Sequence, residues 1–254
     1  MRRKNNKFAK LGLLFITLLI ALASISASYS AWTDTITIQG TVNTLNDYSL
    51  LCLKGYWKFD ETSGSIAYDS SWNSNDGTVY GATWTTGKVN GALFFDGTDD
   101  YVDIGNTLSI TTGFTVMAWV NPSSIGIDRQ IISKGYDGTN TQWELKTSTT
   151  DGKVDFRKWT AGGPVGVTST QTLTVGTWVH LAGTFDGTTW KIYWNGVLDN
   201  SQAGSGPVET PQNLYIGAVD HGGLGHPAQY WHGYIDEAKI YSCVLTQEQI
   251  QAGL

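Results

Sequence analysis

The chain has 254 residues, a formal net charge of −6 and hydrophobic residues at 41% of its positions, enough for one large β domain with a buried core. This acidic balance argues against nucleic acid or anionic lipid as a partner of the body of the chain, because both are negatively charged. The 30 glycines, 11 tryptophans and 12 tyrosines favour strands and tight turns over helices.

Residues 1–30 are organised like an export signal. A basic stretch, Met1 to Lys10, is followed by the apolar run Leu11–Ala23 and by small residues over Ser24–Ala31. This order predicts a secretory signal peptide, and the alternative is a retained membrane anchor of nearly minimal length. We therefore expect a secreted or cell-surface protein that contacts a membrane only through this segment.

Residues 31–50 are expected to form an N-terminal strand or linker. Thr35–Val42 alternates like a half-buried strand, and the junction before it resembles the SipW-type signal regions of surface and matrix proteins. One interpretation is a spacer. The other is a strand that pairs with a second subunit, which would make the protein a self-assembling structural component of a surface or filament.

Residues 51–254 have the pattern of an all-β domain. Gly113–Val120 alternates, with Phe114, Val116, Ala118 and Val120 on one face. Asp-Gly and Asn-Gly pairs bracket the strand Trp190–Trp194, which predicts a three-stranded meander over Thr184–Asp199. A short C-terminal helix is expected after Thr246, because Thr246 and Gln249 form a capping-box pattern.

Seven motifs follow one another in a familiar order. Together they resemble the LamG-like jelly-roll domain of the concanavalin A-like lectin/glucanase superfamily. The resemblance implies two stacked antiparallel sheets over residues 51–254, and it leaves the function open, since this fold serves lectins, adhesion modules and hydrolases. The motifs are Tyr56–Gly64, Gly91–Val102, Phe114–Val120, Ile131–Gly135, Trp178–Gly187, Tyr193–Gly196 and Gly233–Tyr241.

The resemblance makes the first and last strands of the domain neighbours, with Cys52 and Cys243 beside them. A disulfide is expected in an oxidising compartment, and the alternative is two buried thiols. Pairing of the cysteines implies an antiparallel register that sets Phe59 opposite Asp236.

The same resemblance implies a structural Ca²⁺ site, because hard oxygen ligands gather at this end of the domain. The expected ligands are the side chains of Asp60, Asp100 and Asp236 and the carbonyl of Gly97. The alternative is a solvated acidic loop whose aspartates serve turns.

No catalytic residues are predicted. Glucanase relatives use a Glu-x-Asp-x-x-Glu arrangement, which this chain lacks, and a lone acid such as Glu144 is expected to be an exposed strand residue. An unusual glycan-active enzyme remains a further alternative.

The favoured function is therefore a non-catalytic module that recognises a carbohydrate or a surface protein. Aromatic side chains stack on sugar rings while polar neighbours orient the hydroxyls. The candidates for such contacts are Trp143, Trp159, Tyr230 and Trp231, and packing in the core or at its rim is the alternative for each.

Overall fold

The computed structural model describes residues 49–126, 128–136, 140–149, 152–220 and 227–254. The predicted signal peptide, the linker strand Thr35–Val42 and its proposed subunit pairing lie outside the described residues, so these expectations remain predictions. Within the described part, no helix combines the length and apolar character needed to cross a membrane.

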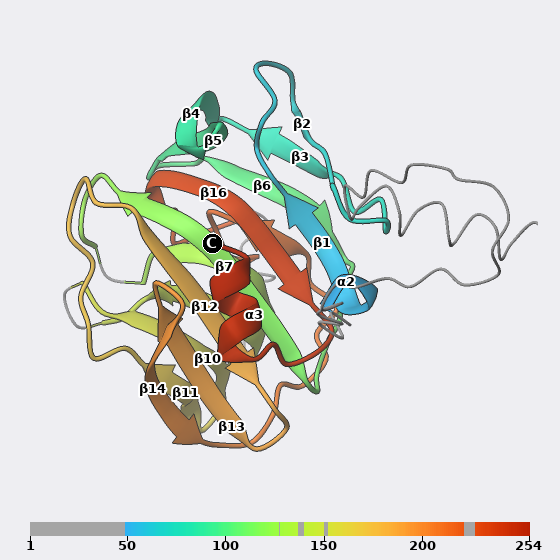
Figure 1. The fold of residues 1–254 in the computed structure, drawn as a ribbon, viewed down its shortest axis with the longest axis vertical. Coiled ribbons are helices and arrows are strands. Elements are labelled where there is room, and N and C mark those ends of the chain that lie inside the picture. The colour runs from blue at the N-terminus through green and yellow to red at the C-terminus, as the bar shows by residue number, and fades with distance from the viewer. Residues whose placement is uncertain (1–48, 127, 137–139, 150–151, 221–226) are drawn as a thin grey trace, which may run out of the picture. The chain divides into compact units, whose positions relative to one another are not determined.

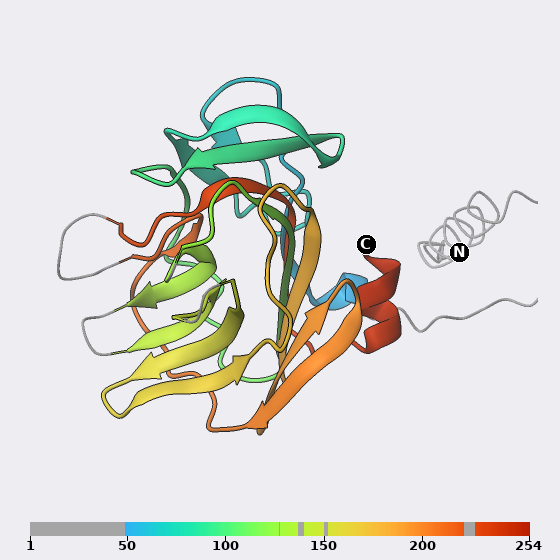
Figure 2. The same ribbon diagram turned by 90° about the vertical axis from the view of Figure 1, so that its left-hand side faces the viewer.

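The domain is an antiparallel β-sandwich, as predicted (Figures 1 and 2). The first sheet has the strand order β14-β13-β12-β7-β16-β5-β4, and β1 also pairs with β16. Its strands are β1 (Leu53–Trp57), β4 (Thr83–Val89), β5 (Gly91–Asp96), β7 (Phe114–Pro122), β12 (Val179–Phe185), β13 (Thr189–Trp194), β14 (Val197–Ala203) and β16 (His232–Tyr241).

The second sheet has the strand order β11-β10-β9-β8-β15-β6-β3-β2. In Figure 2 its green and yellow strands face the orange strands of the first sheet. The strands are β2 (Ile66–Ala67), β3 (Gly77–Tyr80), β6 (Tyr101–Gly105), β8 (Gln130–Tyr136), β9 (Thr141–Thr147), β10 (Val154–Thr160), β11 (Gly163–Thr168) and β15 (Leu214–Ile216).

The main core lies between the two sheets and follows the two-residue period of the strands. Phe114, Val116, Ala118 and Val120 of β7 all contribute to it, which confirms the predicted alternation. Met117 points to the opposite face of the first sheet and belongs to a second, smaller cluster.

Two short helices flank the first sheet. α2 (Ser49–Cys52) leads into β1, and α3 (Gln247–Ala252) covers part of the sheet's outer face through Ile250 (Figure 1). Thr246 and Gln249 form the predicted capping box at the start of α3. The predicted meander is also present as β12, β13 and β14, with a left-handed turn at Asn195 and Gly196.

A disulfide joins Cys52 to Cys243, with 5.8 Å between their Cα atoms, as predicted. The expected register is also found, since Tyr56 pairs with Lys239 and Trp57 with Ala238. The ladder ends at Trp57, before it reaches the expected partners Phe59 and Asp236. Phe59 adopts a left-handed backbone conformation, with φ 57°, and turns its buried ring into the core.

Candidate functional site

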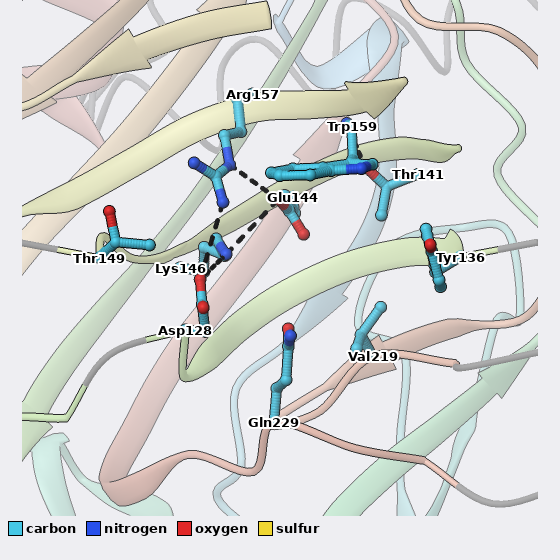
Figure 3. A pocket seen from close by; sticks show the side chains of 10 residues that line it. All are labelled: Asp128, Tyr136, Thr141, Glu144, Lys146, Thr149, Arg157, Trp159, Val219 and Gln229. Carbon is cyan, nitrogen blue, oxygen red and sulfur yellow. Dashed lines mark hydrogen bonds and ion pairs between the residues drawn. The ribbon is translucent and has the colours of Figure 1, made fainter. Parts of the chain in front are cut away.

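A pocket of about 250 Å³ lies on the outer face of the second sheet, over strands β8, β9 and β10 (Figure 3). Side chains from these strands meet others from segments far away in the sequence. The lining residues are Asp128, Tyr136, Thr141, Glu144, Lys146, Thr149, Arg157, Trp159, Val219 and Gln229.

The alternation of β9 and β10 positions the charged groups of the pocket. In β9, Leu145 packs in the core, so its neighbours Glu144 and Lys146 project to the opposite face. In β10, Phe156 packs in the core and Arg157 projects into the pocket. Glu144 and Arg157 are direct cross-strand partners, so opposite charges meet on one face of the sheet.

These charges form a connected network of ion pairs. Arg157 Nε lies 2.9 Å from Glu144 Oε1, and Arg157 Nη1 lies 2.7 Å from Asp155 Oδ2. Lys146 Nζ lies 3.7 Å from Glu144 Oε1 and also pairs with Asp128. The side chains of Glu144, Lys146 and Asp155 are almost completely buried, so the network fixes the floor of the pocket.

Glu144 differs from the sequence prediction, which made it an exposed strand residue. The residue is only 3% exposed. Its Oε1 faces Arg157, and its Oε2 accepts a hydrogen bond of 3.1 Å from Gln130 Nε2. The prediction was wrong because this face of β9 is covered by the neighbouring charged side chains and by Gln229, which also binds Gln130 at 2.7 Å.

Trp159, one of the predicted ligand contacts, is a partly exposed aromatic residue that lines the pocket. Its side chain is 37% exposed, and the guanidinium of Arg157 lies 5.4 Å from its ring centroid. The Trp159 backbone N–H donates to Thr141 Oγ1 at 2.6 Å. Strand pairing and the cation–π contact thus hold the ring beside a charged floor, with part of its surface open to solvent.

The other predicted contact aromatics have different positions. Trp143 and Trp231 are 0% and 1% exposed and belong to the main core, so their assignment as ligand contacts was wrong. The two-residue period explains Trp143, which lies on the same face of β9 as Leu145. Tyr230 is half-buried, and its hydroxyl donates to the carbonyl of Pro227 at 2.6 Å.

Two of the four predicted calcium ligands bind the same hairpin. Asp60 Oδ1 accepts from the Gly91 N–H at 3.0 Å, and Asp236 Oδ2 accepts from the Val89 N–H at 2.8 Å. Asp236 is completely buried, and its Oδ1 has no hydrogen-bond partner among the described residues. Burial raises the pKa of Asp236 to about 7, and the nearby Glu237 adds to this increase.

The other two predicted ligands, Gly97 and Asp100, lie in the loop that joins β5 of the first sheet to β6 of the second. The carboxylates of Asp96, Asp99 and Asp100 have oxygens within 4.8 Å of one another. Burial raises the pKa of Asp100, whose Oδ2 accepts from the Asp96 N–H at 2.8 Å. The Gly97 carbonyl accepts a 3.3 Å hydrogen bond from Arg129, so a positively charged side chain already lies beside this predicted ligand.

The strand register separates these two groups of acids. Asp96 of β5 pairs with His232 of β16, and Asp236 lies four residues further along β16. Four residues of extended strand cover about 13 Å. The four predicted ligands are therefore divided into two pairs, and a calcium site remains a prediction.

Sequence reasoning missed several residues of the pocket, among them Asp128, Lys146, Arg157 and Gln229. One signal was available. Opposite charges alternate with apolar residues in β9 and again in β10, which is the pattern of a strand with one charged face. Asp128 and Gln229 gave no such signal, because they lie in loops that only the folded chain brings to the pocket.

Part of the chain is similar in sequence to a known protein family. The sequence model described as the concanavalin A-like lectin/glucanases superfamily matches residues 96–251. No curated protein matches the chain.

Solved structures with this fold come from several kinds of protein. Domain 4 of AbnA, a GH43 extracellular arabinanase from Geobacillus stearothermophilus, in complex with arabinotriose, is 22% identical with a TM-score of 0.67, covering 80% of this chain and 98% of that one. The binding domain of Paraclostridial Mosquitocidal Protein 1 is 14% identical with a TM-score of 0.61, covering 80% and 52%. A Trypanosoma rangeli sialidase mutant displaying trans-sialidase activity is 17% identical with a TM-score of 0.57, covering 79% and 32%. At these identities the likeness is one of fold.

Proposed function

The chain belongs to the concanavalin A-like lectin/glucanases superfamily, and on this premise we propose that its jelly roll is an exported, non-catalytic module that binds carbohydrate. The observation that carries this proposal is the partly exposed Trp159 ring beside the fixed charged floor of the pocket. A ring of this kind stacks on the apolar face of a sugar, while neighbouring polar groups take its hydroxyls.

The pocket offers both kinds of polar partner to such a ligand. Arg157, with a side chain 10% exposed, has N–H groups left to donate, while Asp128, with a side chain 31% exposed, presents an acceptor at the margin. The resemblance in fold to an arabinanase domain that was crystallised with arabinotriose supports a sugar as the ligand class.

The arrangement of Glu144 supports binding over hydrolysis. A glycosidase needs two carboxyl groups placed on either side of the bond to be cleaved. Both oxygens of Glu144 are already engaged, one by Arg157 and one by Gln130. The carboxylate therefore serves to position Arg157. It has no free oxygen with which to act as a catalytic acid, base or nucleophile in hydrolysis.

Export remains part of the proposal. The disulfide between Cys52 and Cys243 supports folding in an oxidising compartment, which agrees with the predicted signal peptide.

A structural calcium ion also remains part of the proposal, in a narrower form. Asp60 and Asp236 suit it, because the buried Oδ1 of Asp236 lacks a protein partner among the described residues and Ca²⁺ prefers carboxylate oxygens. The ion would join the last strand to the β4–β5 hairpin. Gly97 and Asp100 do not fit the same site, since the strand register places their loop about 13 Å from Asp236 along β16.

A glycan array followed by calorimetry tests the binding function. We expect the protein without its first 30 residues to bind a subset of the glycans, and Trp159→Ala to weaken that binding roughly tenfold. Trp72→Ala is the matched control, because Trp72 is 96% exposed and does not line the pocket. Absence of binding to every glycan, with and without calcium, would refute the proposal, and cleavage of a bound glycan would replace it with an enzymatic function.

A further inference from the structure

A group of four tyrosines lies beside the pocket, three of them on strands β3, β6 and β15 of the second sheet and the fourth, Tyr230, in the segment before β16. The rings of Tyr80 and Tyr101 are stacked, with centroids 4.6 Å apart and planes inclined by 14°. Tyr101 also contacts Tyr215 at 5.2 Å and Tyr230 at 6.5 Å. We call these four residues the tyrosine platform. Tyr80 is 45% exposed, whereas Tyr215 is buried beneath its neighbours, so the platform offers one open aromatic surface on a packed base.

The tyrosine platform lies on the same face of the sheet as the pocket. Successive register partners cross the sheet in one row, from Glu144 to Ser133, then to Tyr215 and to Asp103. Side chains directly opposite each other in antiparallel strands lie on the same face. The core position of Val102, which neighbours Tyr101 in β6, confirms that Tyr101 faces away from the core.

The two regions are also joined through one short segment. Gln229 lines the pocket, and the adjacent Tyr230 contacts Tyr101 of the tyrosine platform. The Tyr230 carbonyl accepts a 2.8 Å hydrogen bond from Arg129, which fixes this segment. A ligand that leaves the pocket past Gln229 therefore meets the tyrosine platform next.

The distance between the two aromatic surfaces sets the size of such a ligand. Trp159 is on β10 and Tyr80 is on β3, and the strand order places five strand spacings between them. At about 4.8 Å per spacing, the surfaces are separated by about 24 Å perpendicular to the strands, and the register adds an offset of about 13 Å along them. A single sugar ring cannot touch both, but a chain of several linked rings can.

The charges around the tyrosine platform favour an uncharged ligand over an anionic one. Burial raises the pKa of Tyr101 and Tyr230, and Asp103 and Asp99, respectively, raise them further. The phenols therefore stay neutral in an acidic neighbourhood that repels anions. Carboxylates near an aromatic surface also accept hydrogen bonds from sugar hydroxyls.

From this geometry we propose that the tyrosine platform is a second subsite for the ligand of the pocket, and that this ligand is an uncharged oligosaccharide that spans both. This inference rests on the proposed carbohydrate-binding function and adds to it the length and charge of the ligand.

Calorimetry with neutral oligosaccharides of one sugar and increasing length tests the proposal. For the wild-type protein, affinity should rise first as the oligosaccharide fills the pocket. It should rise a second time once the oligosaccharide is long enough to reach from the pocket to Tyr80. Tyr80→Ala should remove this second rise, a loss of roughly three- to tenfold for the long chains, and leave the short chains unchanged. Tyr80→Phe keeps the aromatic ring and should therefore retain the second rise in affinity. Acidic oligosaccharides of equal length should bind more weakly than neutral ones.

Tyr68→Ala is the matched control, because Tyr68 is 58% exposed and lies outside the tyrosine platform. If Tyr80→Ala has no effect at any length while Trp159→Ala abolishes binding, the second subsite is refuted and the binding function stands. An equal loss at all lengths, or tighter binding of acidic chains, also refutes it. If the wild-type protein binds no oligosaccharide, both proposals fail together.

Discussion

His180 of β12 lies directly opposite Trp119 of β7 on the outer face of the first sheet, with ring centroids 5.4 Å apart and planes inclined by 66°. His180 is 1% exposed, and its Nδ1 has no hydrogen-bond partner among the described residues. Burial, together with the smaller effect of the positive charge of Lys239, lowers the pKa of His180 to about 3. The folded protein thus holds this imidazole neutral.

The buried imidazole predicts a specific dependence of stability on pH. Between about pH 6.5 and pH 3 the unfolded chain binds a proton at His180 that the folded chain does not. The free energy of unfolding should therefore fall as the pH falls through this window, by up to about 1.4 kcal/mol per pH unit for one such group. His180→Gln, which does not titrate, should reduce that slope. Urea unfolding of both proteins at a series of pH values measures the difference, and parallel curves would contradict the prediction.

Removal of the Glu144 carboxylate should destabilise the fold. Glu144→Ala leaves Arg157 and Lys146 nearly buried without one of their partners, and breaking a buried ion pair typically costs about 3–5 kcal/mol. Lys191→Ala is the matched control, because its pair with Asp186 is about a third exposed and should contribute at most about 1 kcal/mol. Denaturant titration compares the two, and similar losses would show that the network is not a structural support.

Calcium should raise the melting temperature of protein that has been treated with a chelator, because a ligand that binds only the folded state stabilises it. Asp236→Asn should abolish this increase, while Asp100→Asn should retain it, since the two residues belong to separate groups of acids. Differential scanning calorimetry measures both. If Asp100→Asn abolishes the increase and Asp236→Asn retains it, the ion binds at the Asp96–Asp100 loop instead. If calcium does not change the melting temperature of the wild-type protein, the proposed calcium site is refuted.

Loss of the disulfide should lower the free energy of unfolding by about 2–5 kcal/mol, as cross-links that close long loops usually do. The bond joins Cys52 to Cys243, which are separated by 191 positions in the sequence, and so it closes a long loop. The double variant Cys52→Ser, Cys243→Ser should match the wild-type protein measured in reductant. Unchanged stability in both would contradict a structural role for the bond.

The fold was predictable because its signals are local. The alternation around Phe114, the turn at Asn195 and the cap at Thr246 each depend on a few neighbouring residues, and all three are present in the structure. The register of Cys52 and Cys243 followed from the expected pairing of the first and last strands. The predicted pairing of Phe59 with Asp236 is absent, because Phe59 has a left-handed backbone conformation that no sequence pattern indicated.

The pocket was only partly predictable because it depends on long-range contacts. Trp159 follows the charged residues Arg157 and Lys158 of β10 and is partly exposed, and its contact with a ligand remains a prediction. Trp143 was expected to contact a ligand, but it lies on the core face of β9 with Leu145, which is two residues further along the strand. Glu144 does lie on the outer face, where the charged side chains of the network bury it. The contribution of Gln229 depends on a loop that reaches β8 only in the folded chain, through its contact with Gln130.

The covalent link between Cys52 and Cys243 also determines how the domain carries mechanical load. A tensile force applied at residue 49 and at Leu254 passes from Cys52 directly to Cys243. Between these two points the strands of both sheets bear none of the load, and only the short segments outside the bond, including α3, are stretched. The pocket and the tyrosine platform would therefore keep their shape under tension that unravels the ends of the chain.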